Sequence, residues 1–169
     1  MKTYIAAFLL LLSATLAAAH PYLIQRLGIE QGLSNNYVIS ITQDKQGFLW
    51  FATEEGLNKF DGTRFITYYK NELSSPVSSI TGNELNEVFA DPIQPIIWIA
   101  TQRAGLNAFN YETQSFSVYQ NNPEDPQSLI TNDVTHVTSS VHPDKGLWVC
   151  TYYIAEDHAQ KLFFRKVRR

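Results

Sequence analysis

Four histidines and a single cysteine supply the imidazole and thiol groups of this 169-residue chain, which are common metal ligands and, for the thiol, a strong nucleophile. The histidines are His20, His136, His142 and His158, and the cysteine is Cys150. They do not cluster along the chain, so the sequence predicts no metal site. A lone cysteine also forms no internal disulfide bond.

Three acidic residues, Glu54, Glu55 and Asp61, lie near one another and are of the type that performs general acid–base catalysis. Hairpin ends and solvated strand edges explain all three equally well, and Asp61 is followed by a turn-forming glycine. The sequence contains no G-x-S-x-G, G-x-G-x-x-G or H-E-x-x-H motif. We therefore predict no catalytic residue and no cofactor, and expect that the chain is not an enzyme.

A tryptophan-centred segment occurs three times, at Trp50, Trp98 and Trp148. Each tryptophan is followed by a small residue two positions later and by threonine three positions later; the small residues are Ala52, Ala100 and Cys150. Gly-Leu-Asn follows in the first two copies, at 56–58 and 105–107, and an asparagine precedes each copy, at Asn36, Asn83 and Asn132. A period of about 50 residues indicates a repeat architecture. The shared position predicts that Cys150 is a small buried core residue.

Each repeat is predicted to contain four short strands. In the first repeat they span residues 37–43, 48–53, 56–60 and 63–69, and copies of the first strand are expected at 85–90 and 134–138. Aromatic and β-branched residues enrich these stretches, as in strands generally. Asp-Lys-Gln-Gly at 44–47 and Asp-Gly at 61–62 supply the hairpin turns between them.

Four strands in every repeat of about 50 residues form the unit of a β-propeller blade. We predict an all-β fold within residues 20–151: an incomplete β-propeller of about two and a half four-stranded antiparallel blades, at 37–70, 84–120 and 133–151. A further strand-like stretch precedes them at 22–27. A β-sandwich does not predict self-similar units, and leucine-rich or helical repeats have other periods.

The repeated tryptophans are expected to fill the space between neighbouring blades, because an indole buries a large apolar area. The alternative is a tryptophan platform that stacks on a sugar. The polar loops at Ser34–Asn36, Ser78–Asn83 and Ile130–Asn132 could line the ligand-binding face of a ring. The repeated asparagine is more simply explained as a turn residue that bonds its own backbone. We assign no ligand-binding residue from the sequence.

Residues 1–19 have the layout of a secretory signal peptide, with Lys2, an apolar run from Tyr4 to Leu16, and three alanines before the cleavage site. No later stretch approaches the about 20 apolar residues of a membrane-spanning helix. Residues 20–151 carry seven basic and fourteen acidic side chains, a net charge of −7, which disfavours binding to nucleic acid.

Residues 152–169 depart from the repeat, with five basic and two acidic side chains and no glycine. An interrupted reading frame, a diverged blade or a terminal helix would each explain this basic tail. An incomplete ring would also leave two apolar blade faces in water, which favours self-association.

Three segments resemble the two-component regulator propeller repeat: LSNNYVISITQDKQGFLWFATEEGLNKFDG, IWIATQRAGLNAFN and FSVYQNNPEDPQSLITNDV. The resemblance covers about residues 22–151. It implies the periplasmic sensor region of a hybrid two-component histidine kinase that responds to glycan fragments. The kinase core of that family is missing from this sequence, so no catalytic role is carried over. We expect a non-catalytic fragment of such a sensor. The alternatives are a free-standing exported interaction module and a fragment of a propeller lyase or hydrolase.

Overall fold

The computed structural model describes residues 24–71, 79–140, 146–154 and 160–167. The predicted signal peptide lies outside these residues. The described elements, in chain order, are η1 (Ile29–Gln31), β1 (Val38–Gln43), β2 (Leu49–Thr53), β3 (Gly56–Phe60), β4 (Phe65–Tyr68), β5 (Leu85–Ala90), β6 (Ile96–Thr101), β7 (Leu106–Asn110), β8 (Ser115–Tyr119), β9 (Val134–Ser139), β10 (Leu147–Ile154) and β11 (Gln160–Val167).

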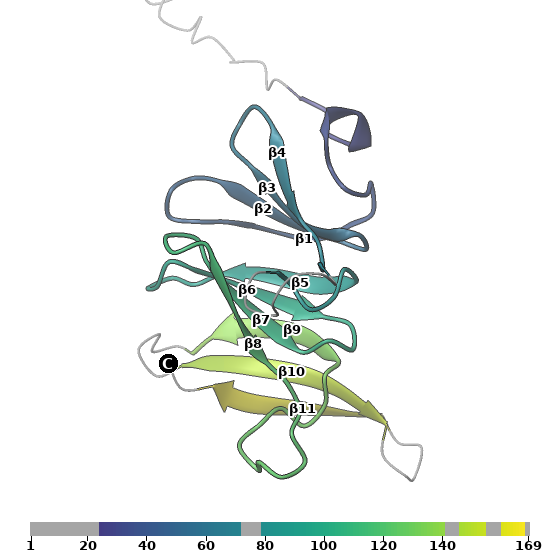
Figure 1. The fold of residues 1–169 in the computed structure, drawn as a ribbon, viewed down its shortest axis with the longest axis vertical. Coiled ribbons are helices and arrows are strands. Elements are labelled where there is room, and N and C mark those ends of the chain that lie inside the picture. Colours follow the sequence, from purple (N-terminus) through teal and green to yellow (C-terminus); the bar gives the residue numbers. More distant parts are fainter. Residues whose placement is uncertain (1–23, 72–78, 141–145, 155–159, 168–169) are drawn as a thin grey trace, which may run out of the picture.

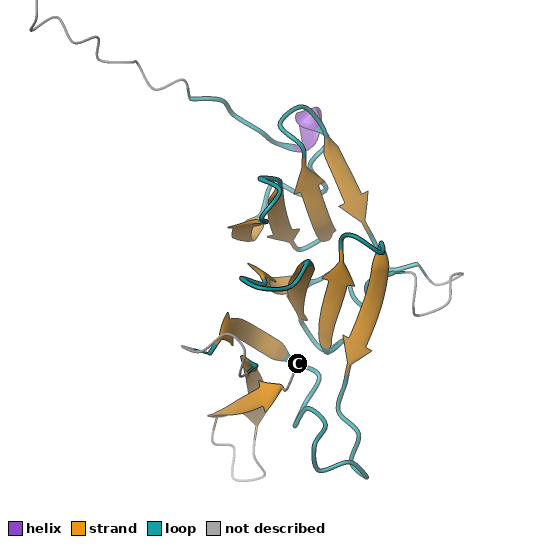
Figure 2. Cartoon of the chain, turned by 90° about the vertical axis from the view of Figure 1, so that its left-hand side faces the viewer, coloured by secondary structure: helices purple, strands orange, loops and turns teal. Residues whose placement is uncertain are grey.

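The strands form three antiparallel sheets in which each strand pairs with its neighbour in sequence. We name them blade 1 (β1–β4), blade 2 (β5–β8) and blade 3 (β9–β11). The sheets follow one another along the long axis of the molecule (Figures 1 and 2). The first strand of each sheet packs against the first strand of the next, β1 against β5 and β5 against β9. This arrangement confirms the prediction of an all-β, incomplete propeller.

The predicted strands agree with the structure to within one or two residues at each end. The strand-like stretch at 22–27 is an exception, because its described residues, 24–27, lie in no strand. A strand needs a neighbouring sheet edge for its backbone hydrogen bonds, and none of the three described sheets supplies one there. Residues 160–167, within the predicted basic tail, form β11. A terminal helix was therefore the wrong explanation for this part of the tail.

Strand β11 takes the place of a third blade strand but carries different residues at matching positions. In blade 1, Phe51 pairs with Asn58, which is fully buried. In blade 3 the corresponding residue, Val149, pairs with Arg165. The backbone of a third strand is thus kept, while the Gly-Leu-Asn sequence of the first two blades is not.

Apolar side chains are buried between successive blades in two clusters. The cluster between blades 1 and 2 contains Trp50, Ala52, Leu57, Ile80, Leu85, Val88, Ile97, Ile99, Phe109, Tyr111 and Phe116. The cluster between blades 2 and 3 contains Trp98, Ala100, Leu106, Ala108, Leu129, Val134, Val137, Leu147 and Val149. Trp50 and Trp98 thus fill the space between blades, as predicted. Trp148, in the last described sheet, is 42% exposed.

A repeated asparagine precedes the first strand of each blade and joins it to the chain that arrives there. The acceptors are Oδ1 of Asn36, Asn83 and Asn132, and the donors are the backbone N–H groups of Ile29 (3.1 Å), Lys70 (2.6 Å) and Asn121 (2.7 Å), in the same order. These donors lie 7 to 13 residues upstream, so the expectation of a bond to the asparagine's own turn was wrong. Lys70 and Asn121 follow the last strands of blades 1 and 2, β4 and β8, whereas Ile29 begins η1. In each case the asparagine provides a partner for a backbone N–H group at the entry to the next blade.

Candidate ligand pocket

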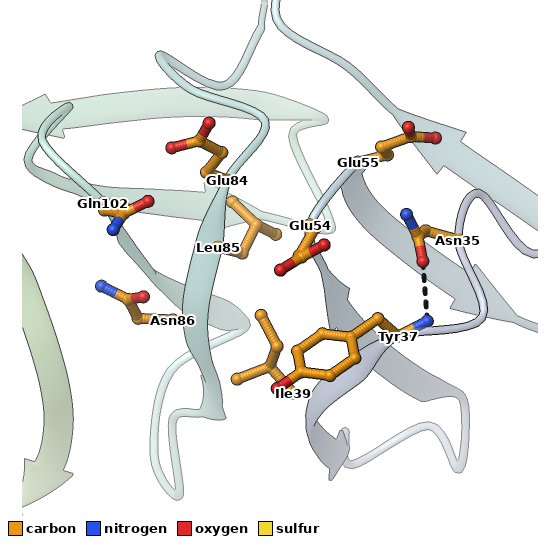
Figure 3. A pocket seen from close by; sticks show the side chains of 9 residues that line it. All are labelled: Asn35, Tyr37, Ile39, Glu54, Glu55, Glu84, Leu85, Asn86 and Gln102. Carbon is orange, nitrogen blue, oxygen red and sulfur yellow. Dashed lines mark hydrogen bonds between the residues drawn. The ribbon is translucent and has the colours of Figure 1, made fainter.

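A pocket of about 530 Å³ opens between blades 1 and 2. Figure 3 shows it at the end of the sheets where β1 and β5 begin, bordered by the β2–β3 and β6–β7 turns. Its lining residues are Asn35, Tyr37, Ile39, Glu54, Glu55, Glu84, Leu85, Asn86 and Gln102. Because both blades contribute, any ligand held here would contact two repeats at once.

The lining is mostly polar and carries three carboxylates. Glu54 and Glu55 lie in the turn between β2 and β3, and Glu84 directly precedes β5. Glu84 forms an ion pair with Arg103 at 3.5 Å; both side chains are largely exposed, so the pair contributes little to stability. Tyr37 is 63% exposed and presents both a ring face and a hydroxyl. Such a lining suits a ligand rich in hydroxyl groups.

A buried network beneath the pocket holds its blade 1 wall in place. The Asn58 side chain accepts a hydrogen bond from the Ser34 backbone N–H at 3.0 Å and donates one to Ser34 Oγ at 2.7 Å. Ser34 Oγ also contacts Thr53 Oγ1 at 2.8 Å. Asn58 and Thr53 are fully buried, so the network is shielded from water. The loop that contains Asn35 and Tyr37 is thereby fixed to the centre of blade 1.

Blade 2 repeats this network one unit later. Asn107 accepts a hydrogen bond from the Thr81 backbone N–H at 3.1 Å and donates one to Thr81 Oγ1 at 2.8 Å. The last residue of the repeated Gly-Leu-Asn therefore fixes the loop before each blade's first strand. The sequence displayed this repeat, but its spacing alone did not reveal the partner of the asparagine.

Of the acidic residues singled out in the sequence, two line the pocket and one does not. Glu54 and Glu55 are pocket residues, whereas Asp61 closes the β3–β4 hairpin. Asp61 accepts the backbone N–H groups of Thr63 and Arg64, both at 2.9 Å, and these bonds lower its pKa. The carboxylates of Glu54, Glu55 and Asp61 are thus not brought together for acid–base chemistry.

The three loops predicted to line a ligand-binding face differ in their position relative to this pocket. The loop at 34–36 contributes Asn35, and Glu84 follows the second loop directly. No residue of the third loop, 130–132, lines this pocket. Tyr37, Asn86 and Gln102 are lining residues that the sequence did not indicate, because their role depends on how two separate repeats meet.

His136 belongs to a contact between the first strands of blades 2 and 3. Its Nδ1 lies 2.8 Å from a carboxylate oxygen of Glu87, whose other oxygen accepts the Val137 backbone N–H. Burial raises the pKa of Glu87, while the Val137 hydrogen bond and His136 act in the opposite direction. His20, His142 and His158 lie outside the described residues. Within the described ranges no group of three or more His, Cys, Asp or Glu could hold a metal ion.

Cys150 is half-buried, whereas Ala52 and Ala100 at the same position of the other blades are fully buried. The prediction of a buried core residue is therefore only partly right, because no further described blade covers this face. Burial raises the pKa of the thiol, and the nearby Glu87 carboxylate acts in the same direction. A thiol held protonated in this way is a poor nucleophile.

Residues 32–55, the end of the first loop through the β2–β3 turn, match the family model for the two component regulator propeller. The chain carries the two-component regulator propeller repeat. The segment matched contains Trp50 and the two pocket carboxylates of blade 1, so the repeat supplies both the inter-blade indole and part of the pocket.

A solved structure similar to this propeller repeat protein is the extracellular domain of the hybrid two-component system BT3049 of B. thetaiotaomicron. It is 80% identical, with a TM-score of 0.77, and the match covers 87% of this chain and 19% of that chain. The chain is therefore homologous to the extracellular sensor domain of a hybrid two-component system, and spans about a fifth of it.

Two further comparisons are more limited in what they show. The extracellular domain of the hybrid two-component system BT4673 of B. thetaiotaomicron is 23% identical over 86% of this chain and 19% of that chain, with a TM-score of 0.62, and shares the fold. Histidine kinase P4 of Formosa agariphila is 58% identical over 40 residues, which are 24% of this chain and 3% of the kinase. Among the described residues, no helix has the length and apolar character needed to cross a membrane.

Proposed function

We propose that this chain is a non-catalytic part of the periplasmic, ligand-sensing propeller of a hybrid two-component sensor kinase, and that its ligand is a glycan fragment. The observation that carries the proposal is the 80% identity, over 87% of the chain, to the extracellular domain of a hybrid two-component system. An extracellular domain of such a system is the part that meets molecules outside the inner membrane.

The pocket between blades 1 and 2 supports a sugar as the ligand. Carboxylates and amides supply directional hydrogen-bond partners for hydroxyl groups, and the exposed ring of Tyr37 supplies an apolar face. Three carboxylates in one pocket repel anionic groups. The pocket therefore favours neutral oligosaccharides over those rich in uronic acid or sulfate.

Binding of oligosaccharides to the purified chain, measured by calorimetry, tests this proposal. A panel of neutral fragments and a matched panel of uronic-acid fragments are compared. We expect binding by one or more neutral fragments, and at least a tenfold weaker affinity when Tyr37→Ala or Glu54→Gln removes a pocket contact.

Glu112→Gln is the matched control, since Glu112 is an exposed carboxylate in the turn between β7 and β8, outside the pocket. This variant should bind like the unmodified chain. Failure of every glycan to bind, or binding that the pocket variants do not weaken, would contradict the assignment of this pocket to a sugar.

A further inference from the structure

The turns between the second and third strands of blades 1 and 2 differ in charge, although the residues on either side of them repeat. In both blades a threonine precedes the turn and Gly-Leu-Asn follows it. Between these, blade 1 has Glu54 and Glu55, whereas blade 2 has Gln102, Arg103 and Ala104. Because blade 2 forms its turn without a carboxylate, the fold of the repeat does not require the acidic pair. The two carboxylates are therefore a feature of the pocket between blades 1 and 2.

Glu54 presents a negative charge to the pocket that no other described group neutralises. Figure 3 shows its side chain pointing across the pocket toward Leu85 of blade 2, whereas Glu55 points away. Among the residues that the structure describes, none forms an ion pair or a hydrogen bond with the Glu54 carboxylate. Glu84, the third carboxylate of the lining, is instead paired with Arg103. A positively charged ligand group would therefore find its partner at Glu54.

An aromatic ring and an aliphatic side chain accompany this carboxylate in the lining. The register of β1 against β2 shifts between Val38 and Ser40, so Ile39 lies in a β-bulge. A bulge can re-aim a side chain, and Ile39 lines the pocket and is 41% exposed. The ring of Tyr37 is more exposed still, so its face is open to a ligand. Ring faces attract ammonium groups. A carboxylate and a ring face in one pocket thus favour an ammonium group over a hydroxyl group.

We propose that the glycan fragment bound in this pocket is an amino sugar, whose protonated amino group pairs with Glu54 and lies against the ring of Tyr37. This inference rests on the proposed function, because it names the class of sugar that the same pocket takes. An ammonium group in place of a hydroxyl group donates a charge-assisted hydrogen bond to the carboxylate, which is stronger than a neutral one. An N-acetylated amino group carries no charge and gains none of this stabilisation.

Calorimetry on the purified chain tests the inference with two tetramers of the same linkage. The chitosan tetramer consists of glucosamine, and cellotetraose consists of glucose, so they differ by an amino group in place of one hydroxyl group in each sugar. At low salt, and at a pH at which the amines are protonated, we expect the chitosan tetramer to bind about tenfold more tightly. Added salt should reduce this difference. The N-acetylated chitin tetramer should bind no more tightly than cellotetraose.

Three variants locate the preference for the amino sugar. Glu54→Gln removes the charge and keeps the shape of the side chain, and should reduce the preference to about threefold or less. Tyr37→Leu removes the ring face and should reduce the preference as well. Glu112→Gln takes the same charge from the chain outside the pocket and should leave the preference unchanged. Circular dichroism should show all three variants folded.

The outcomes separate this inference from the proposed function. No binding of the chitosan tetramer, equal binding of the two tetramers, or a preference that Glu54→Gln leaves intact would overturn the amino-sugar assignment. Binding of neutral fragments to the pocket would then still support the proposed function. Spermidine, which carries ammonium groups without a sugar, should bind more weakly than the chitosan tetramer. Equal binding of spermidine would also overturn the assignment, because the pocket would then recognise charge alone. If no glycan of either experiment binds, the inference and the proposed function both fail.

Discussion

The indole N–H of Trp50 donates a 2.8 Å hydrogen bond to Oδ2 of Asp44, and both side chains are buried. Oδ1 of the same carboxylate accepts the backbone N–H groups of Gln46 and Phe48 at 2.9 and 3.0 Å. One side chain thus closes the hairpin between β1 and β2 and satisfies the polar atom of the indole that fills the space between blades. A buried indole N–H without a partner would be costly.

The same arrangement recurs in blade 2. Trp98 Nε1 donates to Asp91 Oδ2 at 3.0 Å, and Oδ1 of Asp91 accepts the backbone N–H groups of Ile93 and Gln94 at 2.8 and 2.9 Å. The number of residues between aspartate and tryptophan differs by one between the blades. The pairing is therefore a property of the blade and is not tied to one hairpin length.

Asp44→Ala should lower the free energy of unfolding substantially. The substitution leaves the buried Trp50 N–H and two partly buried hairpin N–H groups without their acceptor. Each buried group left unpaired costs about 1–3 kcal/mol, and water entering the hairpin will offset part of the total. We expect a loss of roughly 3 kcal/mol in urea-induced unfolding followed by tryptophan fluorescence.

Asp61→Ala is the matched control for that prediction. Asp61 also accepts two backbone N–H groups in a hairpin, but it has no indole partner and its hairpin is exposed. Water can replace the lost bonds there, so the loss should be about 1 kcal/mol or less. Equal losses for the two variants would mean that the Asp44–Trp50 contact contributes nothing of its own.

The features that the sequence predicted well are those encoded within a few residues. Hairpin residues such as Asp44 and Gly62, with alternating apolar positions between them, locate the strands. The 48- and 50-residue spacing of the tryptophans locates the blades. Their repetition identifies Trp50 and Trp98 as the side chains that fill the space between neighbouring blades.

The features that the sequence did not predict depend on contacts between distant segments. Asn58 bonds Ser34 across 24 residues, and the pocket combines Tyr37 of one repeat with Gln102 of the next. A repeated residue type shows that a position is constrained, but its partner emerges only when the sheets are placed side by side. The exposure of Trp148 has the same origin, since an identical sequence position becomes a surface wherever no further sheet covers it.

Gly105→Ala should be more destabilising than Gly62→Ala. Both glycines have positive φ, 91° and 94°, so alanine is strained at either position. An added Cβ at Gly105 would collide with the backbone oxygen of Tyr119, whereas the Cβ at Gly62 would meet nothing within 4 Å. We expect a loss of about 1 kcal/mol at Gly62 from strain alone, and of at least 3 kcal/mol at Gly105, in urea unfolding. Similar losses at the two sites would show that the backbone of β8 shifts to relieve the collision.

Asn58→Ala should weaken the pocket as well as the fold. The buried amide holds the Ser34 backbone and side chain, and its loss leaves the half-buried Ser34 N–H group without its acceptor. We expect the free energy of unfolding to fall by about 2–3 kcal/mol, and hydrogen exchange at the backbone of residues 34–37 to accelerate. Asn107→Ala, which makes the equivalent change in blade 2, should destabilise the chain to a similar extent without accelerating exchange at 34–37. Unchanged exchange in the Asn58 variant would contradict the role assigned to this side chain.

The Glu87 carboxylate should make the chain less stable as the pH rises above the ordinary pKa of a glutamate. Burial raises its pKa from 4.5 in the folded chain, so between 4.5 and the raised value the folded state binds more protons than the unfolded state. The free energy of unfolding then decreases with pH across that window and is constant above it, as far as this group is concerned. Glu87→Gln removes the titration, so the stability of the wild type relative to this variant should decline over the same window in urea unfolding at a series of pH values.

Asp61→Asn provides a control of opposite sign for the same experiment. Backbone hydrogen bonds from Arg64 and Thr63 lower the pKa of Asp61, so the folded state binds fewer protons than the unfolded state. The stability that this carboxylate contributes is fully present when the pH is above 3.8, the ordinary pKa of an aspartate. It is lost as the pH falls through the lowered pKa of Asp61 in the folded chain. The wild type should therefore gain stability relative to Asp61→Asn as the pH rises, while it loses stability relative to Glu87→Gln. If the stability of the wild type changed with pH in the same direction relative to both variants, burial between β5 and β9 would not control the pKa of Glu87.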